Sequence, residues 1–143
     1  MGKAANSSIS LKQIHVTDNF WNKYVHLVKD VIIPYQWDIL NDKLEDVETS
    51  HCIENFKIAA GEKEGEFQGA VFQDTDVAKW LEAVGFVLNY ERDEKLEELA
   101  DETIELIGRA QQPDGYLNTY FTIKEPDGRW SNQIGRASCR ERV

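Results

Sequence analysis

Apolar residues recur every three or four positions along most of this chain, a spacing that favours helices over strands. The pattern is most regular in the segment that begins at Asp93. The residues of that stripe are Leu96, Leu99, Ala100, Ile104 and Ile107. Strands and helices do not alternate in a βαβ rhythm, so a parallel sheet is not expected. The sequence therefore predicts a mainly α chain.

The N-terminal third is predicted to enter through a short extended segment and then turn helical. Imperfect alternation over Ile9–Val16 predicts a short strand or an extended entry. Asp18 stands where a helix N-cap belongs, and helical spacing continues from there to Pro34, which should end or kink the helix. A second helical piece is predicted over 35–44.

Two further helices are predicted before the one at Asp93. The first runs from His51 to Ala60 and stops at Gly61. The second is capped by Asp74 or Thr75, and it forms an αα-hairpin with the helix that follows it. The residues of its apolar stripe are Val77, Leu81, Val84 and Leu88, with Trp80 beside them.

The C-terminal part contains two turn sequences, QPDG at 112–115 and PDG at 126–128. They flank the β-prone stretch Tyr116–Ile123, which predicts a short β-hairpin. The last ten residues, 134–143, carry three arginines and one acid without any helical or strand period. We expect this segment to be foreign, derived from a vector or adaptor, and residues 1–133 to form the domain. The alternative is a natural basic C-terminal tail.

Composition excludes several classes of function. The net charge of −10 argues against a nucleic-acid-binding surface, which needs clustered basic residues. The chain contains no apolar run of about 18 residues, so no membrane span is expected. Its start lacks the apolar core of a secretory leader, and its two cysteines cannot form a disulfide framework. These features together favour the cytoplasm.

The block FQDTDVAKW contains the candidate site residues Phe72, Gln73 and Asp74. Asp74 and Asp76 could form a pair of carboxylates, as in glycosidases, but residues two apart on a helix do not share a face, and capping explains both. Phe72 either stacks on a sugar or belongs to the core.

His51 is adjacent to Cys52 rather than spaced from it, which makes a poor metal pair. Trp21 and Trp80 are expected in the core.

Four blocks, in order and at their spacings, resemble the N-terminal part of glycoside hydrolase family 127, the β-L-arabinofuranosidases. They are HVTDNFW, VIIPYQWDILND, ENFKIAAGEKEGEFQGAVFQDTDVAKWLEAV and DETIELIGRAQQPDGYLNTYFTIKEPDGRW. The resemblance implies part of an (α/α)6 toroid and a retaining hydrolase that releases terminal β-L-arabinofuranosyl units from plant-type glycans. It also implies that an arabinose-containing oligosaccharide is the ligand, and a homodimer of the full-length protein is one expected assembly.

The family's nucleophile is a cysteine near a zinc ion, and its acid/base is a glutamate. The resemblance places these residues and the zinc ligands downstream, and neither Cys52 nor Cys139 matches them. No catalytic or metal-binding residue is therefore assigned here. Phe72 stands at a family position that lines the arabinose pocket, and Gln73 and Asp74 neighbour it.

An (α/α)6 toroid needs roughly 200 residues at minimum, and this chain has 143. We therefore expect an incomplete toroid that is inactive alone and exposes apolar surface, for example along Leu81, Val84 and Leu88. The alternative is a self-standing helical module that binds a carbohydrate or another partner without catalysis.

Overall fold

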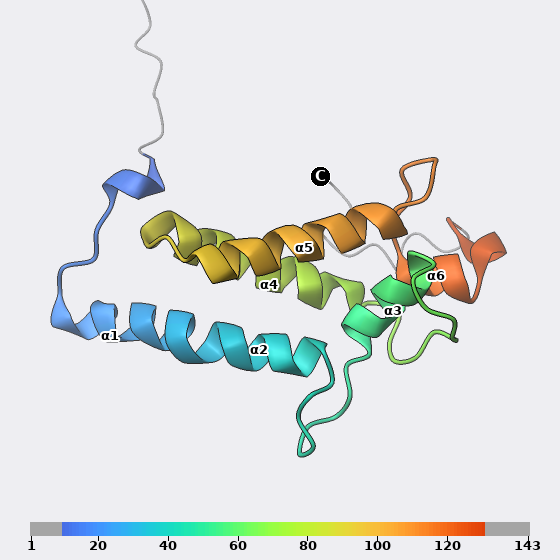
Figure 1. The fold of residues 1–143 in the computed structure, drawn as a ribbon, viewed down its shortest axis with the longest axis horizontal. Helices are drawn as coiled ribbons and strands as arrows, with labels where there is room; N and C mark the ends of the chain where they lie inside the picture. The colour runs from blue at the N-terminus through green and yellow to red at the C-terminus, as the bar shows by residue number, and fades with distance from the viewer. Residues whose placement is uncertain (1–9, 131–143) are drawn as a thin grey trace, which may run out of the picture.

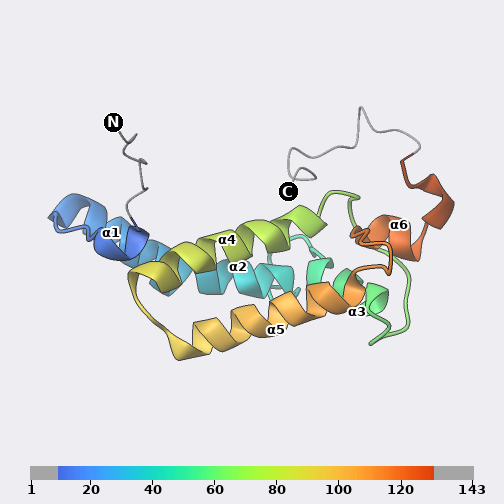
Figure 2. The ribbon, with the colours of Figure 1, turned by 90° about the horizontal axis from the view of Figure 1, so that it is seen from above.

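The computed structural model describes residues 10–130, and these residues form helices and loops without a strand. In chain order the elements are η1 (Leu11–Gln13), α1 (Asn19–Leu27), η2 (Val28–Ile32), α2 (Ile33–Leu40), α3 (Cys52–Ala59), α4 (Asp74–Tyr90), α5 (Glu94–Ala110), α6 (Thr119–Ile123) and η3 (Pro126–Gly128). The first long rod, α1 to α2, lies beside the α4–α5 hairpin, and α3 and α6 gather at one end (Figure 1). Seen from above, α2 lies behind the α4–α5 hairpin and appears between its two helices (Figure 2). Helix α4 contacts α2, α3 and α5.

The predicted helices and the αα-hairpin are confirmed, and so is the mainly α class. Asp18 caps α1 by accepting hydrogen bonds from the N–H groups of Phe20 and Trp21, at 3.0 and 2.8 Å. Gly61 ends α3 with a left-handed φ of 74°. No helix among residues 10–130 is both long and apolar enough to cross a membrane.

Pro34 does not end the first rod. The five residues before α2 form a π-helical turn, η2, and Pro34 lies in the first turn of α2. Proline lacks the N–H group of an α-helical hydrogen bond, and its ring crowds the carbonyl group four residues earlier. A wider turn just before it lets the chain continue as a helix.

Neither predicted strand forms among residues 10–130, although Ile14 has an extended backbone, as in the alternative of an extended entry. Within Ile9–Val16 the described residues contain the single turn η1. The predicted β-hairpin over Tyr116–Ile123 is replaced by α6, whose N-cap Asn118 accepts a hydrogen bond from the Phe121 N–H at 3.0 Å. Side-chain capping of the helix start outweighs the β-propensity of the aromatic and β-branched residues there.

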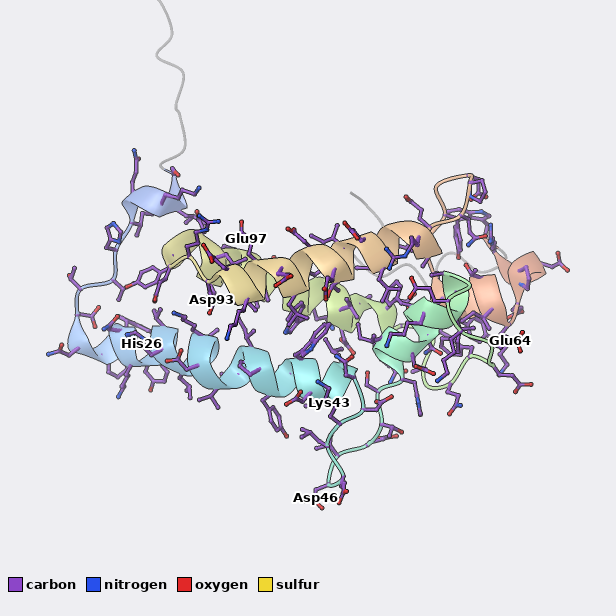
Figure 3. All side chains as sticks on the ribbon, in the orientation of Figure 1. His26, Lys43, Asp46, Glu64, Asp93 and Glu97 are labelled. Atoms are coloured by element: carbon purple, nitrogen blue, oxygen red, sulfur yellow. The ribbon has the colours of Figure 1, made fainter. Side chains whose placement is uncertain are left out.

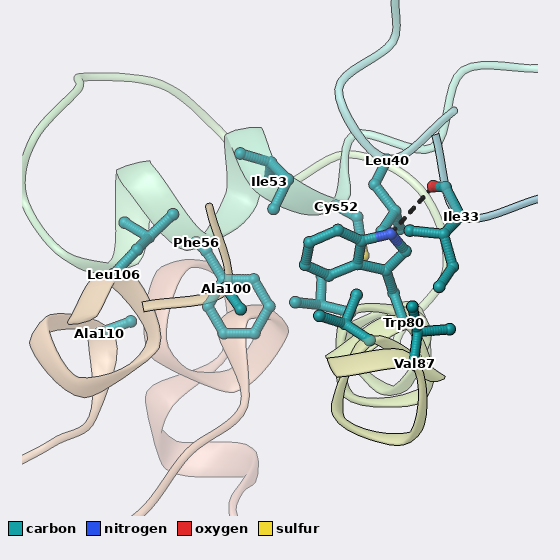
Figure 4. Packing of buried hydrophobic residues seen from close by; sticks show 12 residues of the cluster. Ile33, Leu40, Cys52, Ile53, Phe56, Trp80, Val87, Ala100, Leu106 and Ala110 are labelled. Carbon is teal, nitrogen blue, oxygen red and sulfur yellow. Dashed lines mark hydrogen bonds between the residues drawn. The ribbon is translucent and has the colours of Figure 1, made fainter. Parts of the chain in front are cut away.

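The core lies between the rod from α1 to α2 and the α4–α5 hairpin, and Trp80 is one of its buried residues (Figure 4). The indole N–H of Trp80 donates to the Ile33 carbonyl oxygen at 3.1 Å, which ties α4 to the start of α2. Trp21, expected in the core, is 61% exposed on α1 and contacts Phe20 and Tyr24 instead.

Apolar surface is exposed, but not where it was expected. Val84 of α4 is fully buried in the core, and Leu81 and Leu88 pack against that core. The exposed apolar stripe lies instead along the rod from α1 to α2. Its residues are Phe20, Tyr24, Leu27, Val31 and Tyr35.

Candidate functional site

A cavity of about 340 Å³ opens between α2, the first half of α4 and the loop that precedes α3. Its apolar wall includes Trp80 and two residues of the π-helical turn, Val28 and Ile32. Turns of this kind often occur at functional sites. The polar lining residues are Gln36, Glu48, Thr49, Ser50, Gln73, Asp76 and Lys79. An apolar wall with a few amide, hydroxyl and charged groups suits a small polyhydroxylated ligand.

Gln73 is the one predicted site residue that lines this cavity. Its Oε1 accepts a hydrogen bond from the Ala70 N–H at 2.6 Å, which fixes the carboxamide against the turn before α4. The turn favours Gly69, because its φ is 89° and a Cβ there would meet Oε1 of Gln73. Among the described residues no acceptor engages Nε2 of Gln73, so this N–H group remains available to a ligand.

Asp74 does not cap α4, and neither does Thr75. Gln73 occupies the N-cap position without a side-chain capping bond, and the hydroxyl of Thr75 donates to the Phe72 carbonyl at 2.9 Å. The carboxylate of Asp74 instead accepts hydrogen bonds from the N–H and the hydroxyl of Thr119, at 2.7 and 2.6 Å. Burial raises the pKa of Asp74, and the two hydrogen bonds oppose that rise. Its carboxylate is thus engaged in joining α4 to α6.

Phe72 is not a core residue, since 68% of its surface is exposed. It precedes Gln73 in sequence but does not line the cavity. The ring is accessible to a ligand that extends out of the cavity, and the assignment of Phe72 to a sugar subsite stays a prediction.

The loop between α2 and α3 forms the polar rim of the cavity through Glu48, Thr49 and Ser50. Two of its non-glycine residues, Asp42 and His51, have left-handed backbones with a φ of 55°. Such conformations cost on the order of 1 kcal/mol or more and persist where surrounding contacts hold them. Here the contact is the Asp42 carboxylate, which accepts from the Ser50 N–H at 2.6 Å and from the His51 N–H at 3.0 Å.

Cys52 lies just behind this rim and is fully buried. Its thiol donates to the Gln73 carbonyl oxygen at 2.8 Å. Burial, together with the nearby negative charge of Asp74, raises the pKa of Cys52 to about 12. A thiol in this state is neither a nucleophile nor a metal ligand at neutral pH.

Residues 10–130 hold no group of three or more His, Cys, Asp or Glu side chains that could bind a metal ion, so they do not fit the zinc site that the resemblance implies.

Sequence reasoning missed Gln36, which the structure places in the cavity wall. A signal for it was present: Ile32, Gln36 and Ile39 follow helical spacing, so Gln36 is a polar interruption of an otherwise apolar stripe. Lys79 was also missed. It forms an ion pair with Asp76 at 2.7 Å across one turn of α4.

Comparisons with known proteins agree with one another. The sequence model of the GH127 catalytic domain, β-L-arabinofuranosidase, matches residues 13–137. A non-reducing end β-L-arabinofuranosidase from Bifidobacterium longum subsp. longum is 40% identical over an alignment that covers 84% of this chain and 20% of the relative. The match to residue 137 enters the segment predicted to be foreign, which lies outside the described residues.

Solved structures give the same result. The crystal structure of a GH127 β-L-arabinofuranosidase from Geobacillus stearothermophilus T6 is 64% identical, with a TM-score of 0.81, over 82% of this chain and 19% of that one. A second GH127 β-arabinofuranosidase structure is 31% identical with a TM-score of 0.70, over 82% of this chain and 18% of its own. The chain thus spans about a fifth of the length of these relatives.

Proposed function

The chain belongs to the GH127 β-L-arabinofuranosidase family, and on that premise we propose that residues 10–130 supply one wall of the sugar pocket of a retaining glycoside hydrolase. The substrate of the whole enzyme would be a plant-type glycan with terminal β-L-arabinofuranosyl units. The observation that carries the proposal is the cavity between α2 and α4, with Gln73 and Gln36 beside Trp80.

The lining groups match the chemistry of a furanose. A pentose ring presents hydroxyl groups that both donate and accept, and C–H faces that pack on apolar surface. The Nε2 group of Gln73 would donate to a sugar hydroxyl, and the carboxamide of Gln36 would both donate and accept. Phe72, which is exposed outside the cavity, would contact the next sugar unit.

We place the reaction itself on other residues of the family protein. Hydrolysis through a cysteine needs a thiolate, and the raised pKa of Cys52 keeps that thiol protonated. The nucleophile, the acid/base and the zinc ligands would therefore come from the part of the relatives that this chain does not match. The chain by itself would bind sugar but not hydrolyse it.

Calorimetric titration with L-arabinose tests the binding role. We expect the Gln73→Ala variant to lose binding and the Gln68→Ala variant, at an exposed position outside the cavity, to keep it. Equal binding by the wild type and by Gln73→Ala would contradict the proposed pocket. Release of arabinose from a β-L-arabinofuranoside by the purified chain would contradict the predicted inactivity.

A further inference from the structure

We propose that Asp42 is a positioning residue of this pocket: its carboxylate holds residues 48–51 as the polar rim, although Asp42 itself does not line the cavity. This inference rests on the proposed sugar pocket and adds a residue that shapes it from behind. The rim supplies Glu48, Thr49 and Ser50 to the cavity.

The backbone at Asp42 shows why the side chain matters. The N–H groups of Asp42 and Lys43 donate to the carbonyls of Ile39 and Asp38, both at 3.0 Å, which is the Schellman pattern at a helix end. In this pattern the residue that occupies the left-handed region is usually glycine. A glycine at position 42 would satisfy the backbone, but only a side-chain acceptor reaches the amides of the rim.

The carboxylate of Asp42 makes several contacts with the far end of the loop. Oδ1 accepts from the Ser50 N–H at 2.6 Å, and both oxygens accept from the His51 N–H, at 3.0 and 3.1 Å. Oδ2 also lies 3.4 Å from Nδ1 of His51, whose Nε2 is 2.9 Å from the Thr49 hydroxyl. One side chain thereby orders three consecutive rim residues.

The rest of the loop gives the rim little other support. Its tip, around Asp46, projects away from the helices (Figure 3), and Asp46 is exposed. Among the described residues the hydrogen bonds from 48–51 to the end of the first rod all go to Asp42, which follows α2; on the other side, the His51 carbonyl accepts from the Asn55 N–H of α3 at 2.8 Å. Loss of that carboxylate should therefore release the rim while α2, α3 and the core stay in place.

The test compares Asp42→Gly with Asp42→Asn and with the control Asp46→Gly on the same loop. Two measurements are made: amide hydrogen exchange of Ser50 and His51, and calorimetric titration with L-arabinose. We expect Asp42→Gly to speed the exchange of both amides and to weaken binding, each about tenfold, because charge-assisted hydrogen bonds are lost. Asp42→Asn keeps one acceptor oxygen and should recover most of the binding, and Asp46→Gly should match the wild type.

The two proposals fail in different ways. Unchanged exchange in Asp42→Gly, or wild-type binding by that variant, would overturn the role of Asp42. If the wild type binds no arabinose, the proposed sugar pocket fails, and the exchange measurement alone then decides whether Asp42 holds the rim. A loss of binding in Asp46→Gly equal to that in Asp42→Gly would also overturn the inference, since any change in the loop would then suffice.

Discussion

Asp42 and Asp74 perform similar tasks, and they differ in how deeply they are enclosed. Each accepts a backbone N–H from a residue further along the chain: Ser50 and His51 for Asp42, Thr119 for Asp74. The Asp42 side chain remains 21% exposed, whereas Asp74 is enclosed enough for burial to raise its pKa. One carboxylate orders a solvent-facing rim, and the other joins two helices.

The difference shows that an acid in a specific motif need not be the one that serves the ligand. Asp74 lies in one of the blocks that resemble the family, yet both of its oxygens accept hydrogen bonds from Thr119. Asp42 was not among the predicted site residues, yet its carboxylate holds the rim of the cavity. Substitutions that separate the two roles can confirm or refute this distinction.

The largest effect is expected from Asp74→Ala. Thr119 is only 1% exposed, so its N–H and hydroxyl would lose their acceptor without gaining water. An unsatisfied buried polar group costs about 1 to 3 kcal/mol, and the relief of a buried charge offsets part of that loss. We expect the free energy of unfolding to fall by about 2 kcal/mol, measured by urea denaturation.

The matched control is Asp76→Ala on the same helix. Asp76 and its partner Lys79 are 43% and 53% exposed, and an exposed ion pair contributes at most about 1 kcal/mol. If Asp76→Ala lowered the free energy of unfolding as much as Asp74→Ala, the distinction between the buried Asp74–Thr119 hydrogen bonds and the exposed Asp76–Lys79 ion pair would be wrong.

The next effect concerns the backbone alone. The end of α3 repeats the hydrogen-bond pattern at the end of α2, with Gly61 at the left-handed position and the Glu62 N–H bonded to the Lys57 carbonyl at 2.9 Å. A Cβ at Gly61 would meet no atom within 4 Å, so Gly61→Ala isolates the cost of the positive φ. We expect thermal denaturation to show a loss of about 1 kcal/mol. No loss would mean that the left-handed backbone at Asp42 needs no contact to hold it.

A smaller effect should appear in the pH dependence of stability. The pKa of Asp74 in the folded chain is raised above its ordinary value of 3.8. Between those two pKa values the folded state binds more protons than the unfolded state, so the free energy of unfolding falls as pH rises through that window. The Asp74→Asn variant lacks this titration. The stability of the wild type relative to Asp74→Asn should therefore decline with rising pH in urea denaturation; a flat difference would refute the raised pKa.

The sequence predicted the helices and the turns better than the faces that they bury. The caps at Asp18 and Asp93 and the stop at Gly61 are local, so the chain near each residue decides them. Burial depends on neighbours far along the chain. On α5, Ala100 is buried as predicted, but Ile104 is 54% exposed while Thr103 is enclosed. The packing partners of α5, which are α3 and α4, select that face.

The candidate site was predictable only where sequence neighbours share a location. Gln73 lines the cavity, whereas Phe72 and Asp74 on either side of it turn elsewhere, because adjacent residues at a helix start point in different directions. The rim residues 48–50 lie next to Gln73 only after α2 and α4 have packed, so their spacing in sequence gives no sign of the cavity.

The smallest expected effect is a change in the reactivity of Cys52, which is influenced by both carboxylates. The charge of Asp74 raises the pKa of this thiol, whereas a hydrogen bond with Ser50, the residue held by Asp42, lowers it. In a Cys139→Ser background, iodoacetamide should modify Cys52 only slowly at neutral pH, because its pKa of about 12 leaves almost no thiolate. Asp74→Asn should speed alkylation by lowering the pKa of the thiol, measured by mass spectrometry at pH 9 under conditions where the variant stays folded. An unchanged rate of alkylation in Asp74→Asn would show that the charge of Asp74 does not act on this thiol, and the account of Asp74 as a buried carboxylate that raises the pKa of Cys52 would then be wrong.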